Sequence, residues 1–134
     1  MKERQEFTVA GLAPPVSHYC DAVRFGDLLF ISGLVGVDGD GKLVGEGDAA
    51  RQTRQIFENM RKVLDAAGAG FGDVLKVTVF LKNIEDRARI NPVRQEFFGA
   101  ARPASTLVEI SNLIRPDLLV EIEAVVGLPS GSQS

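Results

Sequence analysis

The hydrophobic positions of this chain follow two different periods, and the changes between them mark the expected elements. Two β-prone runs, Ala22 to Phe25 and Leu28 to Ser32, are separated only by Gly26 and Asp27. A connection of two residues suits a tight turn between antiparallel strands. The sequence therefore predicts a β-hairpin at this position.

The segment from Asp48 to Ala67 has a helical pattern. Its apolar side chains recur every three or four residues, so they form one stripe along a helix that would be buried. Asp48 can cap the first turn, and Gly68 follows the last apolar position, so these two residues mark the expected ends. The stripe consists of Ile56, Met60, Val63, Leu64 and Ala67.

In the next segment, Val74 to Lys82, apolar residues recur at every second position, as in a β-strand. One of its faces should lie against a helix, and the residues expected on that face are Leu75, Val77, Val79 and Leu81. A second helix should begin near Ile84 and end near Gly99, and Pro92 would either interrupt or restart it.

Two more strands, about Ser105 to Ser111 and Leu118 to Val126, complete the expected elements. This order predicts an α+β fold, a mixed sheet with two helices on one face. The other face of such a sheet tends to be buried against another copy of the chain. We expect one domain over residues 1–128 and a flexible tail, rich in Gly and Ser, over residues 129–134.

Composition narrows the class of protein. With 134 residues and 45% hydrophobic content, the chain can bury about two-thirds of its unfolded surface in one domain. Its net charge of −3 disfavours nucleic acid as a partner, because phosphate binding needs a basic face. The charged start MKERQEFTV is no secretory signal, and no run approaches about 20 apolar residues, so we expect a cytoplasmic protein without membrane contact.

We expect no metal site. Cys20 is the single cysteine, which excludes an internal disulfide and a zinc site of the usual kind. Asp38 and Asp40 have the spacing of the first two ligands of a calcium loop, but Lys42 occupies the position of the third. The pair predicts a solvated turn instead.

One stretch near the C-terminus carries a known signature. Residues 102–126, RPASTLVEISNLIRPDLLVEIEAVV, resemble the RidA/YjgF family pattern P-A-R-S-x-V-E-V followed by an E-I-E-A strand. The resemblance extends back through Asn91 and Ser32-Gly33 to Tyr19, which matches a tyrosine common in the family. The matching positions in the signature are Pro103, Ala104, Val108, Glu109, Ile110, Glu121, Ile122, Glu123 and Ala124.

This resemblance implies a chorismate mutase-like fold, assembled as a homotrimeric barrel with small-molecule substrates bound in clefts between subunits. In deaminating members, a glutamate at the position of Glu121 holds the water that hydrolyses an imine. The resemblance also places the backbone around Gly33 and Leu107 at the pocket, and Tyr19 and Asn91 beside the ligand.

Elementary chemistry is consistent with this role for Glu121. An imine carbon is electrophilic once its nitrogen is protonated, so hydrolysis needs a positioned water and a route for protons. One carboxylate can supply both without a cofactor. Glu121 and Glu123 share one face of the last strand, and the alternative is that both are ordinary strand glutamates.

Three neighbouring residues have two interpretations each. His18, the single histidine, could shuttle protons beside the cleft or have no such role. Tyr19 could form a hydrogen-bonding lid over the ligand or be a half-buried aromatic with a hydrated hydroxyl. Cys20 fits a small buried hydrophobic residue better than a reactive one.

The family's carboxylate-binding arginine falls on Ser105. Loss of such a bidentate partner typically costs about 2–5 kcal/mol of binding, so a substrate carboxylate must be held differently here. Ser105 and Thr106 would offer hydroxyls to a polar group. The missing charge could come from Arg94, Arg102 or Arg115, although each could equally be a solvated surface residue.

The leading hypothesis is therefore a hydrolytic deaminase of an imine or enamine of a carboxylic acid, either a small 2-iminoacid or an unsaturated acid such as 2-aminomuconate. The alternative is a trimer of the same fold that binds a metabolite, or serves as a scaffold, without chemistry. A third possibility is hydrolysis of another labile C–N bond. Glu121 is compatible with all three.

Overall fold

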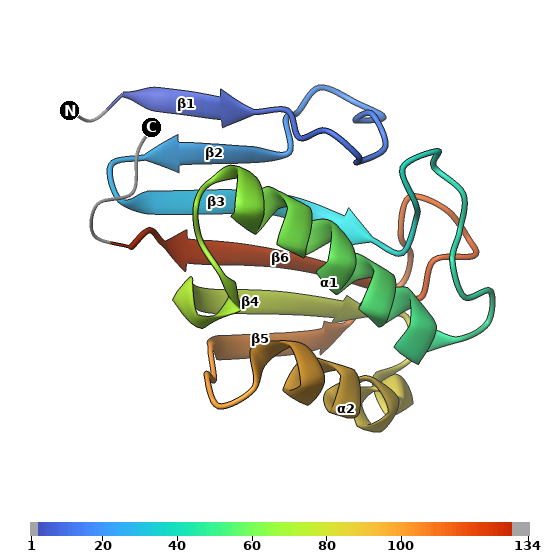
Figure 1. Cartoon of the computed structure of the whole chain (residues 1–134). Coiled ribbons are helices and arrows are strands. Elements are labelled where there is room, and N and C mark those ends of the chain that lie inside the picture. The colour runs from blue at the N-terminus through green and yellow to red at the C-terminus, as the bar shows by residue number, and fades with distance from the viewer. Residues whose placement is uncertain (1–2, 130–134) are drawn as a thin grey trace.

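The computed structural model describes residues 3–129 and has one six-stranded sheet, in the order β1-β2-β3-β6-β4-β5, with both α-helices on one face (Figure 1). The predicted α+β class is confirmed. The predicted tail lies outside the described residues, apart from Pro129. The elements are β1 (Arg4–Phe7), β2 (Ala22–Phe25), β3 (Leu28–Val35), α1 (Ala49–Ala66), the 3-10 turn η1 (Phe71–Asp73), β4 (Val74–Leu81), the 3-10 turn η2 (Ile84–Asp86), α2 (Arg87–Phe98), β5 (Ala104–Glu109) and β6 (Val120–Gly127).

The predicted hairpin is formed by β2 and β3. Phe25 pairs with Leu28, and Gly26 turns the chain with a φ of 62°, which a residue with a Cβ rarely adopts. Strands β4 and β5 run parallel, joined through α2, while the other pairs are antiparallel. The sheet is therefore mixed, and the parallel pair places β5 at its edge.

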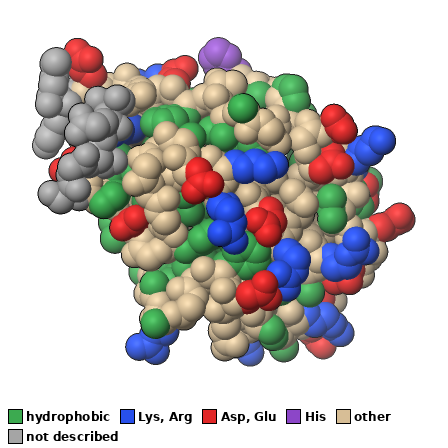
Figure 2. All heavy atoms as spheres, viewed as in Figure 1, with side chains coloured by type: hydrophobic (Ala, Val, Ile, Leu, Met, Phe, Trp, Pro, Cys, Tyr) green, Lys and Arg blue, Asp and Glu red, His purple; other side chains and the backbone are tan. Residues whose placement is uncertain are grey.

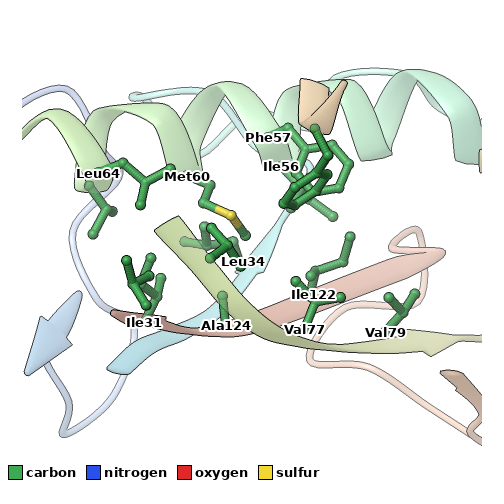
Figure 3. Packing of buried hydrophobic residues seen from close by; sticks show 14 of the residues in the cluster. Ile31, Leu34, Ile56, Phe57, Met60, Leu64, Val77, Val79, Ile122 and Ala124 are labelled. Carbon is green, nitrogen blue, oxygen red and sulfur yellow. The ribbon is translucent and has the colours of Figure 1, made fainter. Parts of the chain in front are cut away.

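Helix α1 forms as its pattern predicts. The Asp48 side chain accepts a hydrogen bond from the Arg51 amide at 3.1 Å and caps the first turn. The whole predicted stripe is buried, and Figure 3 shows Ile56, Met60 and Leu64 pointing from the helix onto the sheet. Burial of each such side chain contributes about 1.5–3 kcal/mol, so this layer dominates the core.

The second helix differs from its prediction in one respect. Pro92 lies inside α2, so the expectation that this residue interrupts or restarts the helix is wrong. A proline removes one backbone hydrogen bond, and here packing compensates, because Ile90 and Val93 on either side are buried. The helix instead begins with the turn η2, which Asn83 caps by accepting a hydrogen bond from the Glu85 amide.

Strand β4 contains a second correction. Val77, Val79 and Leu81 face the helices as expected, but Leu75 is 51% exposed. The pairing of β4 with β6 shifts register between Val74 and Lys76, and this irregularity turns Leu75 away from the core. Strand β1, which pairs with β2 along the charged N-terminal segment, was not predicted at all.

Charged side chains of both signs are interspersed over the face that carries the helices (Figure 2). This distribution gives no large basic surface on that face. Within residues 3–129, neither helix combines the length and apolar character that crossing a membrane requires.

Candidate active site

An open pocket of about 550 Å³ lies at the end of β3. Its walls come from the segment that precedes β2, from β3 and β6, and from the loops after β3 and before β6. Among its lining residues are Tyr19, Gly33 and Glu121, three of the residues that the sequence singled out.

A bulge in β3 shapes the pocket wall. Ile31 pairs with Ala124 and Leu34 pairs with Ile122, so three steps along β3 match two steps along β6. The extra residue breaks the ladder at Ser32 and Gly33 and bends the strand. Space opens there because Gly33 has no side chain: a Cβ at this position would lie 2.8 Å from Glu121 Cδ.

The Glu121 carboxylate lies against this bulge. Val120 and Ile122 point into the core, so Glu121 and Glu123 share the face of β6 that points away from the helices, as predicted. No donor within residues 3–129 makes a hydrogen bond to the Glu121 carboxylate, so both oxygens are available to water or ligand. The structure therefore presents a half-buried carboxylate that is not bound to another side chain.

Burial raises the pKa of Glu121 above the ordinary value of a glutamate, and the like charge of Glu123 raises it further. Both causes disfavour the ionised form. A carboxylate with a raised pKa is a stronger base than an ordinary one, which suits proton removal from water near neutral pH.

The segment before β2 holds Tyr19 over the pocket. Ser32 donates from its hydroxyl to the Cys20 carbonyl at 2.6 Å, and the buried Asp21 side chain accepts from the Val9 amide at 2.7 Å. These bonds fix the chain directly after Tyr19. The Tyr19 hydroxyl accepts a long bond of 3.4 Å from the Val16 amide. The Tyr19 side chain is about half exposed at the rim.

His18 and Cys20 are not among the residues that line the pocket. His18 is exposed, and the half-buried Cys20 thiol lies 3.4 Å from the Ala22 carbonyl. Proton shuttling by His18 stays a prediction, and the placement of its side chain gives it no support.

Two buried amides that sequence reasoning missed hold the pocket loops. Asn59 on α1 donates to the carbonyls of Val35 and Val37, at 3.3 and 2.9 Å, where β3 ends. Gln52 donates to the carbonyls of Gly45 and Asp117 and accepts from the Leu119 amide. The available signal was a polar residue inside the apolar stripe of the helix, since Asn59 lies next to Met60 and three positions after Ile56.

Arg115 also lines the pocket, but its guanidinium is occupied. It makes two bonds to the Asp117 carboxylate, at 2.9 and 3.2 Å, and a third to the Gly41 carbonyl at 2.9 Å. The Asp117 carboxylate raises the pKa of Arg115 and neutralises its charge. Arg115 therefore joins two loops at the rim.

The remaining predicted residues form a second group at the far edge of the sheet. Ser105, Thr106 and Leu107 lie on the edge strand β5, and Asn91 lies on α2 beside it (Figure 1). Ser105 pairs with the buried Val77 and so shares the helix face, whereas the Thr106 hydroxyl on the opposite face accepts a bond from Lys76 Nζ at 3.0 Å. A ligand can contact both hydroxyls only around the strand edge.

The two groups do not converge within one chain. Glu121 pairs with Phe80, which pairs with Val108, so these residues form one row across the sheet. Ser105 is three residues along β5 from that row, about 10 Å, and two strand spacings away, also about 10 Å. It faces the helices while Glu121 faces away, so one small ligand cannot contact both in the same chain.

Comparison with known proteins identifies the family. The profile of the endoribonuclease L-PSP family, also called RidA/YjgF, matches residues 10–127. The chain belongs to this family. A RutC family protein of Pyrococcus horikoshii is 43% identical over 111 residues, which cover 83% of this chain and 87% of the relative.

Two RidA/YjgF relatives carry names that state an activity. The 3-aminoacrylate deaminase RutC of Acinetobacter baylyi is 36% identical over 115 residues, covering 86% of this chain and 90% of the relative. The 2-iminobutanoate/2-iminopropanoate deaminase of Dermatophagoides farinae is 36% identical over 116 residues, with the same two coverages.

Solved structures confirm the fold. The YjgF gene product of E. coli superposes with a TM-score of 0.84 at 30% identity, covering 92% of this chain and 98% of that one. The yeast protein YEO7 gives a TM-score of 0.90 at 28% identity, covering 95% and 100%. The predicted RidA fold is thus confirmed, while the roles of the individual site residues stay predictions.

Within residues 3–129 of this RidA/YjgF protein, no group of three or more His, Cys, Asp or Glu side chains is arranged to hold a metal ion.

Proposed function

We propose that this protein is a hydrolytic deaminase of imines or enamines, with Glu121 as its catalytic base. The observation that carries the proposal is the Glu121 carboxylate itself. It lies half-buried in the wall of a pocket, makes no hydrogen bond to any other described residue, and has a pKa raised by burial and by Glu123.

The proposed reaction needs one water and no redox change. A water held by Glu121 attacks the protonated imine carbon while the carboxylate accepts one of its protons, which gives a carbinolamine. The proton then passes from Glu121 to the amine nitrogen. The C–N bond breaks with its electron pair on nitrogen, and ammonia leaves while the carbinolamine hydroxyl gives its proton to the Glu121 carboxylate and the carbonyl forms. A carboxylate whose pKa is raised above the ordinary value can perform these proton transfers, and general acid–base catalysis contributes about 10²–10⁴-fold.

We further propose that the active unit is a homotrimer with its sites between subunits. The separation of Glu121 from Ser105 within one chain supports this, because a second copy can bring its β5 edge to the pocket of the first. The apolar side chains on the face of the sheet without helices also support it: Phe30 is 47% exposed, Leu28 41% and Val108 38%. Burial of that face would stabilise an assembly of copies.

The proposed substrate is an imine or enamine that carries a carboxylate. Relatives named for 3-aminoacrylate and for 2-iminobutanoate and 2-iminopropanoate support this class. An unsaturated acid such as 2-aminomuconate belongs to it too, with its carboxylates placed differently. The family's ribonuclease name is a poorer guide, since the pocket lining contains Asp21, Glu121 and Glu123 while the charge of its Arg115 is neutralised by Asp117. We expect the reaction to take place in the cytoplasm.

Ammonia release tests the proposal. Freshly generated 2-iminobutanoate, 2-iminopropanoate, 3-aminoacrylate and 2-aminomuconate are supplied to the wild-type protein, to Glu121→Gln and to the matched variant Glu123→Gln. We expect turnover above the spontaneous rate, a loss of about 10²–10⁴-fold in Glu121→Gln, and a much smaller loss in Glu123→Gln.

Two results would reject this function. A wild-type rate equal to spontaneous hydrolysis for every substrate would favour the non-catalytic alternative, a metabolite-binding or scaffold protein. Equal small losses in both variants would show that Glu121 and Glu123 are ordinary strand residues.

A further inference from the structure

The Arg94 guanidinium contacts Ser105 on the edge strand, at the position where the family pattern has an arginine. Its Nη2 donates a hydrogen bond to Ser105 Oγ at 2.8 Å. Arg94 comes from α2, and Ser105 is on the helix face of β5, so the contact joins two elements. The Ser105 hydroxyl holds one Nη of the guanidinium, and the other N–H groups of Arg94 make no hydrogen bond within residues 3–129.

The charge of Arg94 has no counter-ion within the described chain. No carboxylate in residues 3–129 makes an ion pair with it, unlike Arg54, Arg89 and Arg115, each of which has an acidic partner. The Arg94 side chain is half-buried, and this burial lowers its pKa with no neighbouring acid to offset the effect. A desolvated cation without a counter-ion attracts an anion more strongly than a hydrated one.

The other cations near the predicted site are less suited to bind an anionic ligand. Arg115 is bound to Asp117, and Arg102 is exposed and makes no side-chain hydrogen bond or ion pair within residues 3–129. Lys76 bonds to Thr106 on the other face of the sheet, where Glu123 lines the same small pocket, so an acidic residue lies in its surroundings. Arg94 is half-buried, is held by Ser105 and makes no ion pair with any residue in 3–129.

We propose that Arg94, held by Ser105, binds the carboxylate of the substrate in this protein. The anion site thus lies on a helix, where the family pattern has it on the strand. This inference rests on the proposed deaminase function for the identity of the ligand, and the site itself rests on the geometry of Arg94 and Ser105.

The chemistry of the two side chains fits a carboxylate. A guanidinium offers parallel N–H groups that match the two oxygens, and the Ser105 hydroxyl, which accepts from Arg94, still has a hydrogen to donate. Asn91 is three residues before Arg94 and so lies on the same side of α2, where its amide can donate as well. These three residues form one polar edge that another copy can bring to the pocket.

Paired substrates test the inference. Arg94→Gln is compared with the wild type on 2-iminobutanoate and on the imine of propanal, which has the same chain without the carboxylate. We expect KM for 2-iminobutanoate to rise at least about 30-fold, because removal of one partner of a charged pair has that effect or more. The rate on the propanal imine should not change. The KM of Arg94→Lys for 2-iminobutanoate should lie between those of the wild type and Arg94→Gln. Lys76→Gln serves as the control, and its KM should change by less than about threefold.

Direct binding separates this inference from the proposed function. 2-Oxobutanoate, a stable carboxylate, is titrated calorimetrically into the wild type and into Arg94→Gln. Weakening of at least about 30-fold in the variant supports the anion site even if no imine releases ammonia, which would reject only the deaminase. Equal affinities, equal loss on both imines, or no binding of 2-oxobutanoate to the wild type would each overturn the inference, whether or not ammonia is released.

Discussion

Gly33 and Glu121 fit together so closely that the absence of one side chain determines the position of the other. A Cβ at Gly33 would lie 2.8 Å from Glu121 Cδ and 3.1 Å from Cγ. Strand β3 bulges at this point, which brings the Gly33 backbone alongside the carboxylate. The glycine and the bulge therefore position the proposed catalytic base.

Gly33→Ala should reduce activity much more than stability. The added methyl group displaces the carboxylate, and displacement of a catalytic group by about 1 Å can cost about 10²-fold in rate. The backbone at Gly33 does not require a positive φ, and Glu121 is a flexible side chain, so the fold can adapt. Rate and thermal midpoint are measured together, with Gly72→Ala as a control, because a Cβ there meets nothing within 4 Å. A fall in stability with an unchanged rate would contradict this role.

Glu121→Gln should be more stable than the wild type at neutral pH. Folding raises the pKa of Glu121, so the folded state holds this proton more tightly than the unfolded chain does. The resulting stabilisation is fully present below the ordinary carboxyl pKa and is lost as pH rises through the raised one. Glutamine removes the cost of the buried charge. Thermal unfolding from pH 3 to pH 8 should show a difference that grows with pH, and a constant difference would contradict the assignment.

The pH dependence of the rate should carry the signature of the same group. Ionised Glu121 is the active base, so kcat/KM should fall with decreasing pH at a higher pH than an ordinary glutamate would give. Glu123→Gln removes the like charge and should move this limb to lower pH. Since burial is the larger cause, the limb should stay above the ordinary value. An unmoved limb in Glu123→Gln would mean that the two carboxylates do not interact.

The sequence could predict those features that a regular period encodes. The stripe of α1, the hairpin around Gly26 and the shared face of Glu121 and Glu123 follow from helical and strand spacing. The position of Leu75 does not, because a bulge shifts the phase of a strand without altering its apolar pattern. Strand β1 is not predictable from its sequence either. Its residues RQEF are mostly polar, and the strand pairs with β2 alone at the edge of the sheet.

The candidate site was only half predictable for a similar reason. The family resemblance located Tyr19, Gly33 and Glu121, which the fold does bring to one pocket. It could not show that Arg94 lies on Ser105, because this contact joins a helix and a strand whose mutual position no local pattern specifies. From the sequence alone, Arg94 is one of three nearby arginines that could bind the carboxylate.

Assembly should depend on the apolar face of the sheet. Phe30→Glu places a charge on that face, where Phe30 is 47% exposed in the single chain. If the face is buried between copies, the buried charge should dissociate the trimer. Activity should then be lost, although Phe30 does not line the pocket that contains Glu121. Sedimentation at micromolar concentration checks the state. Ile84→Glu is the control, since Ile84 is 43% exposed on η2, outside the sheet. A wild-type monomer, or an intact trimer in Phe30→Glu, would contradict the proposed interface.

Transfer of the arginine back to the strand should rescue its removal from the helix. Ser105→Arg alone places a second guanidinium beside that of Arg94, and two like charges at the strand edge repel each other, so we expect little gain on 2-iminobutanoate. Ser105→Arg combined with Arg94→Gln leaves one cation at the position of the family pattern. This double variant should recover at least about tenfold of the kcat/KM that Arg94→Gln loses, a difference of about 1.4 kcal/mol in transition-state stabilisation. Steady-state kinetics on the four proteins form a double-mutant cycle, which isolates the coupling between the two positions. Additive losses would show that Arg94 and position 105 do not serve the same carboxylate.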